Sequence, residues 1–217
     1  YCYNFTTMNT DADNDNEDND NEKQVSIIVR KPQEGKTFIC LKSIEKNASN
    51  IVHLIVTMNT IKSNLQFFQR ANIKFNNICI FNSKYKKKKK TQDEYNHANN
   101  IEELLEFIKS DIKIIIMCAH YKRFYESINQ LLSKLSNIEI IIHIDEAHKY
   151  VPSYRSEVSY MISFDIVKKM FLYSATPFNI WTEKKDSIFQ KLYIVDIEKE
   201  FNIKKTTEYF GVKDCNI

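Results

Sequence analysis

The sequence predicts a doubly wound α/β domain in which helices flank a mostly parallel central sheet. From residue 25 onward, short runs of β-branched residues alternate with longer amphipathic stretches, which is the pattern of repeated strand–helix units. Several runs are apolar at every position, as expected for strands that a parallel sheet buries on both faces. The chain has 217 residues, 43% of them hydrophobic, so it can bury the core of one ordinary domain.

Each element follows from a local pattern. The expected strands are residues 25–29, 51–56, 78–81, 112–117, 138–144, 170–173 and 192–197. The expected helices are residues 37–47, 60–71, 101–110, 123–136 and 157–164. In the third helix, Leu104, Leu105 and Ile108 recur at helical spacing and indicate a face that packs on the sheet.

Two segments interrupt this pattern. Residues 1–22 contain seven acidic side chains and no Lys or Arg, and their low complexity predicts a disordered acidic lead-in. Residues 84–97 begin with a lysine-rich run and predict a surface insertion. A solvated loop is the preferred interpretation of this run, and a contact with nucleic acid is the alternative.

Charge, cysteine content and hydropathy limit the partners and the location. After residue 22 the chain carries 31 Lys and Arg against 21 Asp and Glu, a net charge of +10 that suits a polyanion or is simply solvated. The five cysteines include no C-x-x-C pair, which favours a reducing, intracellular location: cytoplasm or nucleus or, for a viral protein, a viral factory or virion. No apolar run approaches the roughly 18 residues of a membrane span, so no membrane partner is expected. Because the sequence lacks an initiating Met, we expect a piece of a longer protein.

A Gly-Lys-Thr triplet lies between the first strand and the first helix. Gly35 is one of two glycines in the chain, and Lys36 and Thr37 follow it directly. Backbone N–H groups at a helix start cradle phosphate oxygens, a Lys neutralises their charge, and a Thr hydroxyl ligates Mg²⁺. The triplet alone occurs often by chance, but its place after a β-branched strand favours a phosphate-binding loop. The expected nucleotide-binding residues are Pro32, Gln33, Glu34, Gly35, Lys36 and Thr37.

Two carboxylates follow the strand at 138–144. Asp145 and Glu146 lie at its carboxyl end, where ligands of open α/β sheets bind. An Asp in this place can hold Mg²⁺, and the adjacent Glu can polarise an attacking water. The alternative is a strand that ends in a charged loop. A third strand end, after 170–173, carries Ser174, Ala175 and Thr176, which alone would be only a turn.

Together the three segments resemble the motifs of superfamily 2 helicases of the DEAH type, and they occur in the family's order. Asp145-Glu146-Ala147-His148 is a complete match to the family's second motif. The resemblance implies a RecA-like P-loop NTPase domain over 23–200, with 201–217 as a linker toward a second RecA-like domain. It also implies ATP and Mg²⁺ as cofactors. Lys36 would bind the β- and γ-phosphates, Thr37 and Asp145 the metal, and Glu146 the water. His148, Ser174, Ala175 and Thr176 would couple the nucleotide to nucleic acid and to the partner domain.

Weaker matches suggest where nucleic acid, DNA or RNA, would bind. Thr57, Asn59 and Lys62 occupy the place of a backbone-contacting motif of the family, and His120 lies at a further strand end. Each site has an equally good interpretation as a strand-to-helix turn.

The expected function is the ATP-binding half of a nucleic-acid-dependent ATPase, a helicase or translocase that works with a second RecA-like domain. The alternative is a truncated or decayed helicase domain that binds nucleotide or nucleic acid without turnover. Two departures from the family keep this alternative open. Arg30, Gln33 and Glu34 replace the loop's usual small residues, and the sequence has no room for a second domain.

Overall fold

The computed structural model describes residues 24–30, 35–47, 51–82, 95–120, 126–176, 180 and 193–201. Several predicted features lie outside these ranges. They are the acidic lead-in at 1–22, the loop residues Pro32, Gln33 and Glu34, the lysines at 84–90, and the linker beyond residue 201. Within the described ranges, no helix combines the length and the apolar character that a membrane crossing requires.

The described residues form an eight-stranded sheet in the order β4-β3-β5-β2-β6-β7-β1-β8, and every neighbouring pair is parallel. The strands are β1 Gln24–Val29, β2 Ile51–Thr57, β3 Ile78–Phe81, β4 Asn96–Ala98, β5 Ile114–Cys118, β6 Glu139–Ile144, β7 Val167–Ser174 and β8 Tyr193–Ile194. The helices are α1 Lys36–Lys46, α2 Ile61–Ala71, α3 Ile101–Lys109, α4 Ile128–Lys134, α5 Arg155–Ser163 and α8 Ile197–Phe201, with short 3-10 helices η2 Ala147–Lys149 and η3 Val151–Ser153.

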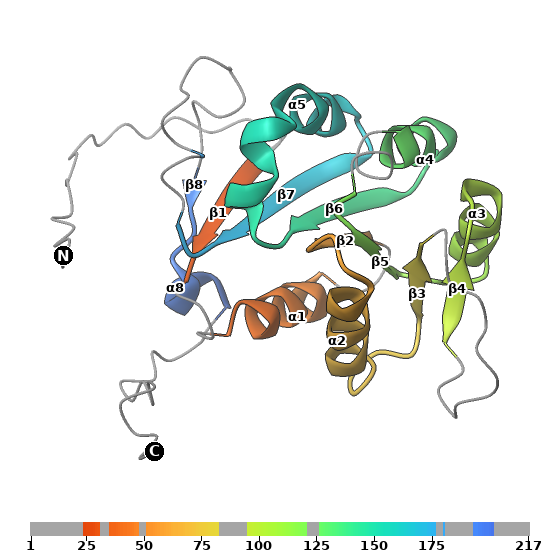
Figure 1. Cartoon of the computed structure of the whole chain (residues 1–217), viewed down its shortest axis with the longest axis horizontal. Helices are drawn as coiled ribbons and strands as arrows, with labels where there is room; N and C mark the ends of the chain where they lie inside the picture. The colour runs from red at the N-terminus through yellow and green to blue at the C-terminus, as the bar shows by residue number, and fades with distance from the viewer. Residues whose placement is uncertain are drawn as a thin grey trace, which may run out of the picture.

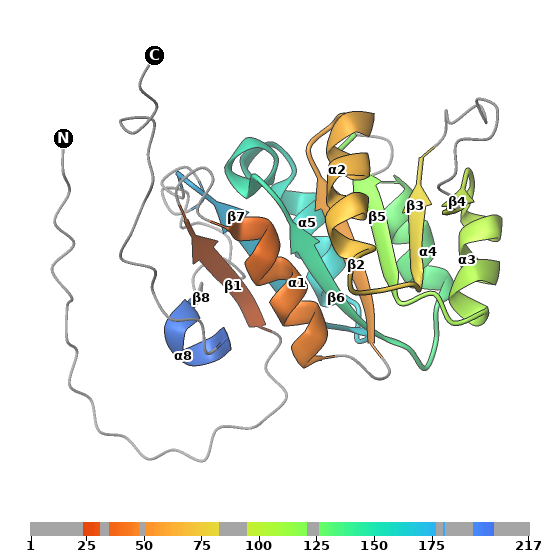
Figure 2. The ribbon, with the colours of Figure 1, turned by 90° about the horizontal axis from the view of Figure 1, so that it is seen from below.

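Helices cover both faces of the sheet. Figures 1 and 2 show α1, α2 and α8 on one side and α3, α4 and α5 on the other. Alternate strand residues enter the two cores: Leu54 packs with the α3–α5 layer, whereas its neighbour Ile55 packs with the α1–α2 layer. All five residues of β5 are buried, as the uninterrupted apolar runs predict. The predicted α/β fold with a parallel central sheet is therefore confirmed.

The fold differs from the sequence prediction at its two edges. The strand β4 begins within the predicted surface insertion at 84–97: Asn96–Ala98 pairs with β3 and buries Ala98 completely. A strand of three residues with two polar side chains carries no periodic signal. At the other edge, the predicted strand at 192–197 is shorter, and Ile197 begins the helix α8 instead.

The strand order brings together the three segments that resemble helicase motifs, at residues 35–37, 145–148 and 174–176. In a parallel sheet all carboxyl ends lie at the same edge, and β6, β7 and β1 are direct neighbours. The segments that follow these strands therefore meet at one edge. The amide of Arg30 donates to the carbonyl of Ser174 at 3.0 Å, so the ends of β1 and β7 are in contact.

Candidate functional site

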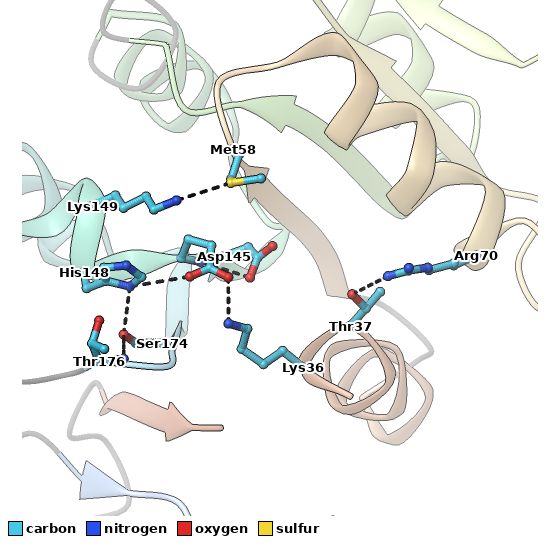
Figure 3. Close-up of polar contacts among 10 residues, drawn as sticks. Lys36, Thr37, Met58, Arg70, Asp145, His148, Lys149, Ser174 and Thr176 are labelled. Carbon is cyan, nitrogen blue, oxygen red and sulfur yellow. Dashed lines mark hydrogen bonds and ion pairs between the residues drawn. The ribbon is translucent and has the colours of Figure 1, made fainter. Parts of the chain in front are cut away.

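Lys36 is the first residue of α1 and points toward the end of β6. Its neighbour Gly35 has φ +80°, a left-handed conformation that favours glycine. A Cβ there would have room, since its nearest neighbour would be 3.8 Å away, so the requirement for glycine is conformational. Lys36 Nζ donates to Glu146 Oε1 at 2.7 Å (Figure 3), and the Lys36 side chain is only 10% exposed. The first turn of α1 thus places a cation beside the β6 carboxylates.

The turn after β6 directs its two carboxylates to different places. The amide of Asp145 donates to the carbonyl of Val56 at 2.8 Å, so Asp145 continues the pairing with β2. Glu146 then has φ 48° and ψ 44°, a left-handed conformation that costs a non-glycine residue roughly 1–2 kcal/mol. The Asp145 side chain stabilises this turn, because its Oδ1 accepts from the amide of Glu146 at 3.0 Å. Local backbone strain of this kind concentrates at functional sites.

Asp145 lies in an unfavourable place for a negative charge. Burial raises the pKa of its carboxyl, and the negative charge of Glu146 raises it further, while Lys36 partly opposes both effects. A cation placed beside the two carboxylates would relieve this cost.

His148 links the end of β6 to the end of β7. Its Nδ1 lies 3.0 Å from Ser174 Oγ and 3.5 Å from Glu146 Oε2. Ser174 Oγ also accepts from the amide of Thr176 at 3.1 Å (Figure 3). Burial lowers the pKa of His148, and the nearby charges of Lys149 and Lys36 lower it further against the opposing effect of Glu146. A continuous set of contacts therefore joins Lys36, Glu146, His148, Ser174 and Thr176.

Lys36 and Glu146 border a cleft of about 590 Å³, a volume typical of sites for small ligands. Its walls come from α1, α2 and the turn after β6. The lining residues are Gly35, Lys36, Thr37, Phe38, Leu41, Arg70, Asp145 and Glu146. Thr37 faces this cleft and accepts a hydrogen bond from Arg70 of α2.

A buried chain of polar side chains crosses the sheet under the cleft. His53 Nδ1 lies 3.0 Å from His143 Nε2, and His143 Nδ1 lies 3.0 Å from Tyr173 Oη. The three residues come from β2, β6 and β7, and Tyr173 lies beside Cys40 of α1. Burial lowers the pKa of His53 to about 4 and that of His143 well below its usual range, so both imidazoles are neutral at physiological pH. His143, Tyr173 and Cys40 border a cavity of about 10 Å³ together with Lys36 and Asp145.

The residues expected to contact nucleic acid lie at the ends of the neighbouring strands β2 and β5. Asn59, Lys62 and His120 are exposed. Thr57 is different, because its side chain is 2% exposed and its hydroxyl donates to Asn64 Oδ1. The Thr57 side chain is therefore turned inward in this structure, unlike the other three residues.

Sequence reasoning missed several residues of this region. Arg70 and Phe38 line the cleft, and the three members of the buried chain lie under it. The hydroxyl of Tyr150, the residue after η2, accepts from the amide of Asn59 at 3.1 Å and so connects this turn to the segment after β2. Phe38 could have been noticed, because it directly follows the Gly-Lys-Thr triplet. Nothing in the sequence indicates that Arg70 contacts Thr37, because the spacing between the two residues follows no recognisable pattern.

Comparisons with known proteins support the fold. No protein-family model matches the sequence, and the comparison with curated proteins gives no match. A solved structure of a nuclease-deletion mutant of the Type ISP restriction-modification enzyme LlaGI, in complex with a DNA substrate mimic, superposes with a TM-score of 0.53 and 18% identity. The superposition covers 72% of the present chain and 16% of the LlaGI chain. The UvsW helicase from bacteriophage T4 gives a TM-score of 0.46 and 13% identity, over 80% of this chain and 54% of that chain.

The chain thus spans about one sixth of the LlaGI chain and about half of the UvsW chain. At 18% identity the likeness to the LlaGI structure is one of fold alone, and that fold is the α/β arrangement with a parallel central sheet that the sequence predicts.

Proposed function

We propose that this chain is the ATP-binding domain of a nucleic-acid-dependent ATPase, a helicase or translocase of the DEAH type that hydrolyses ATP with Mg²⁺. The observation that carries the proposal is the Lys36–Glu146 pair of 2.7 Å at the border of the 590 Å³ cleft. The two residues are 110 positions apart in the chain, and each belongs to a segment that resembles a motif of such enzymes.

Phosphate binding is assigned to the start of α1. The helix has 11 residues, and the N–H groups of its first turn have no partner within the helix, so they suit phosphate oxygens. Lys36 adds a positive charge at the same end. Its ammonium group has three donors, so it can bond to a phosphate oxygen while it keeps its contact with Glu146.

The residues present fit Mg²⁺ bound together with phosphate. Thr37 offers a hydroxyl and Asp145 a carboxylate, and oxygen ligands of this kind suit a hard cation. Among the described residues, no group of three or more His, Cys, Asp or Glu side chains could hold a metal ion unaided. A site with the Asp145 carboxylate and the Thr37 hydroxyl suits Mg²⁺, because this ion keeps several waters and needs only one or two carboxylates beside substrate phosphates. When bound, the ion would neutralise charge on the phosphates and offset the cost of the Asp145 carboxylate.

Glu146 is assigned the role of general base for water. Its left-handed backbone conformation directs its side chain to the cleft while Asp145 stays beside it. A carboxylate within hydrogen-bond reach of a water can take its proton as the water attacks phosphorus. His148 lies 3.5 Å from the other carboxylate oxygen and limits where Glu146 can turn.

Coupling to nucleic acid and to a second RecA-like domain is assigned to His148, Ser174, Ala175 and Thr176. The contacts from Glu146 through His148 to Ser174 give a physical path from the proposed base to the segment after β7. Asn59, Lys62 and His120 are exposed at the same edge of the sheet and suit contacts with a phosphodiester backbone.

The test is the Glu146→Gln substitution in the full-length protein with single-stranded nucleic acid present. Glutamine keeps the size of the side chain but cannot act as a base, so Mg-ATP should still bind while hydrolysis falls by about 10²–10⁴-fold. Glu139→Gln, at the opposite end of β6, is the matched control and should hydrolyse ATP normally. If Glu146→Gln hydrolyses ATP at the parent rate, the assignment of Glu146 is wrong. A parent protein that binds Mg-ATP but never turns it over would be a binding module instead.

A further inference from the structure

Arg70 reaches from α2 into the cleft. It belongs to the last turn of this helix, and its Nη1 donates to Thr37 Oγ1 at 3.1 Å (Figure 3). It borders the same cleft as Lys36, Asp145 and Glu146. Thr37 is the residue expected to hold Mg²⁺, so Arg70 lies at the phosphate end of the cleft.

The charges around the cleft distinguish Arg70 from Lys36. The ammonium group of Lys36 is paired with the Glu146 carboxylate at 2.7 Å. Arg70 has no ion-pair partner within the part of the chain that the structure describes, and its contact there is the Thr37 hydroxyl. Two cationic side chains line the cleft. Among the described residues, a carboxylate neutralises Lys36 but none neutralises Arg70.

A purely structural role explains less of this geometry. A cation in the last turn of a helix stabilises the helix dipole wherever its side chain points. An exposed Arg gives up side-chain entropy when it is held in one conformation. The contact with Thr37 fixes the guanidinium over the cleft, which the helix dipole does not require.

We propose that Arg70 binds the terminal phosphates of a nucleoside triphosphate together with Lys36. This inference rests on the proposed function, because it assigns a further residue to the same site. A guanidinium has five N–H donors in a planar fork, so one can stay on Thr37 Oγ1 while others bond to phosphate oxygens. Thr37 Oγ1 has a second lone pair, which remains available for Mg²⁺. The hydrogen bond to Thr37 thus holds the fork in the orientation that the phosphates need.

The experiment compares Arg70→Gln and Arg70→Met with the parent in calorimetric titrations of the full-length protein with Mg²⁺ and adenosine tri-, di- or monophosphate. Loss of one charge-assisted hydrogen bond should lower triphosphate affinity about tenfold or more. Monophosphate affinity should change little, because its phosphate does not reach the end of the cleft. The matched control is Lys74→Gln, three residues beyond α2, where the same charge is removed from a lysine that pairs with Glu45. Its nucleotide affinities should equal those of the parent.

Thermal melting of each variant separates binding from folding. Equal triphosphate affinity in the parent and in both Arg70 variants would overturn the proposal, as would an equal loss for all three nucleotides. If neither variant folds, Arg70 is a structural residue and the proposal is wrong. Lys36→Ala in the same titrations separates this inference from the proposed function. If Lys36→Ala loses triphosphate affinity and the Arg70 variants do not, the Arg70 proposal is wrong and the proposed function stands. If the parent itself binds no triphosphate, both proposals are wrong.

Discussion

Lys36 Nζ and Glu146 Oε1 lie 2.7 Å apart, which joins the first residue of α1 to the turn after β6 in one ion pair. The pair is mostly buried, with the two side chains 10% and 21% exposed. A partly buried pair of this kind is costly to break by removing one partner, because the other charge stays behind uncompensated.

Lys36→Ala should therefore weaken nucleotide binding strongly. The substitution removes the phosphate-directed cation and leaves the Asp145 and Glu146 carboxylates to repel the phosphates. The expected loss of Mg-ADP affinity is about 10–100-fold, the size of one charged hydrogen bond. Calorimetry measures it, and Lys46→Ala at the far end of α1 is the control. Equal affinities in the parent and in Lys36→Ala would mean that this loop does not bind nucleotide.

Asp145→Asn should separate the metal from the nucleotide. In Mg²⁺ the variant should bind ATP more weakly than the parent, because it loses a charged ligand of the ion. When a chelator removes Mg²⁺, the variant should bind ATP at least as tightly as the parent, because the substitution also removes a negative charge that repels the phosphates. Fluorescent-nucleotide titrations with and without Mg²⁺ measure both affinities. A variant whose ATP affinity responds to Mg²⁺ as the parent's does would show that Asp145 is not a ligand.

Nucleic-acid binding should depend on Lys62 and on salt. Each phosphate contact on a single strand contributes about −0.7 to the slope of log affinity against log salt concentration. Lys62→Gln should weaken binding to single strands of any sequence and make that slope shallower by about this amount. Lys109→Gln, in the last turn of α3, is a matched exposed lysine outside the expected interface. Fluorescence anisotropy at several salt concentrations decides, and an unchanged slope for Lys62→Gln would exclude this contact.

His53 should make the protein less stable in acid. Burial lowers its folded-state pKa to about 4, whereas the unfolded chain takes up the proton near pH 6.5. The unfolded state therefore binds more protons between these values, and the free energy of unfolding falls as pH drops from about 6.5 to 4. The loss from this group is at most about 1.4 kcal/mol per pH unit. His143 acts in the same direction, because burial lowers its pKa too.

Urea unfolding at pH 7 and pH 5 tests this dependence. His53→Asn removes one of the two buried imidazoles, so the difference in stability between the two pH values should shrink. His120→Asn replaces an exposed imidazole and is the control. If His53→Asn keeps the full difference, the acid sensitivity comes from other groups.

The parts of the fold and of the candidate site that depend on a pattern within one segment could be predicted from the sequence. The runs that became β2, β5 and β6 are long and apolar, so their burial and their parallel arrangement followed from composition alone. Lys36 and Asp145 could be chosen as candidates from the sequence, because Lys36 begins a helix signal and Asp145 follows a strong strand signal. Local signals of this kind do not depend on which strands become neighbours.

The remaining features depend on register between segments far apart in the chain. His53 lies opposite Ile141 in the sheet, so its contact with His143 is a diagonal one that requires the register of β2 against β6. His143 lies opposite Phe171, and its contact with Tyr173 is again diagonal. The bond from Arg70 to Thr37 needs the relative placement of two helices. No pattern within a single segment encodes these distances.

The diagonal chain of His53, His143 and Tyr173 also restricts how this sheet can change over evolutionary time. All three side chains are buried, and His143 holds a hydrogen-bond contact with each of the other two. Replacing one member with an apolar residue leaves a buried polar neighbour unsatisfied, whereas replacing linked partners together can be nearly neutral. Relatives of this protein should therefore carry either the whole set of three or none of it. Lineages with one member missing should be rare, although the three residues lie on three different strands.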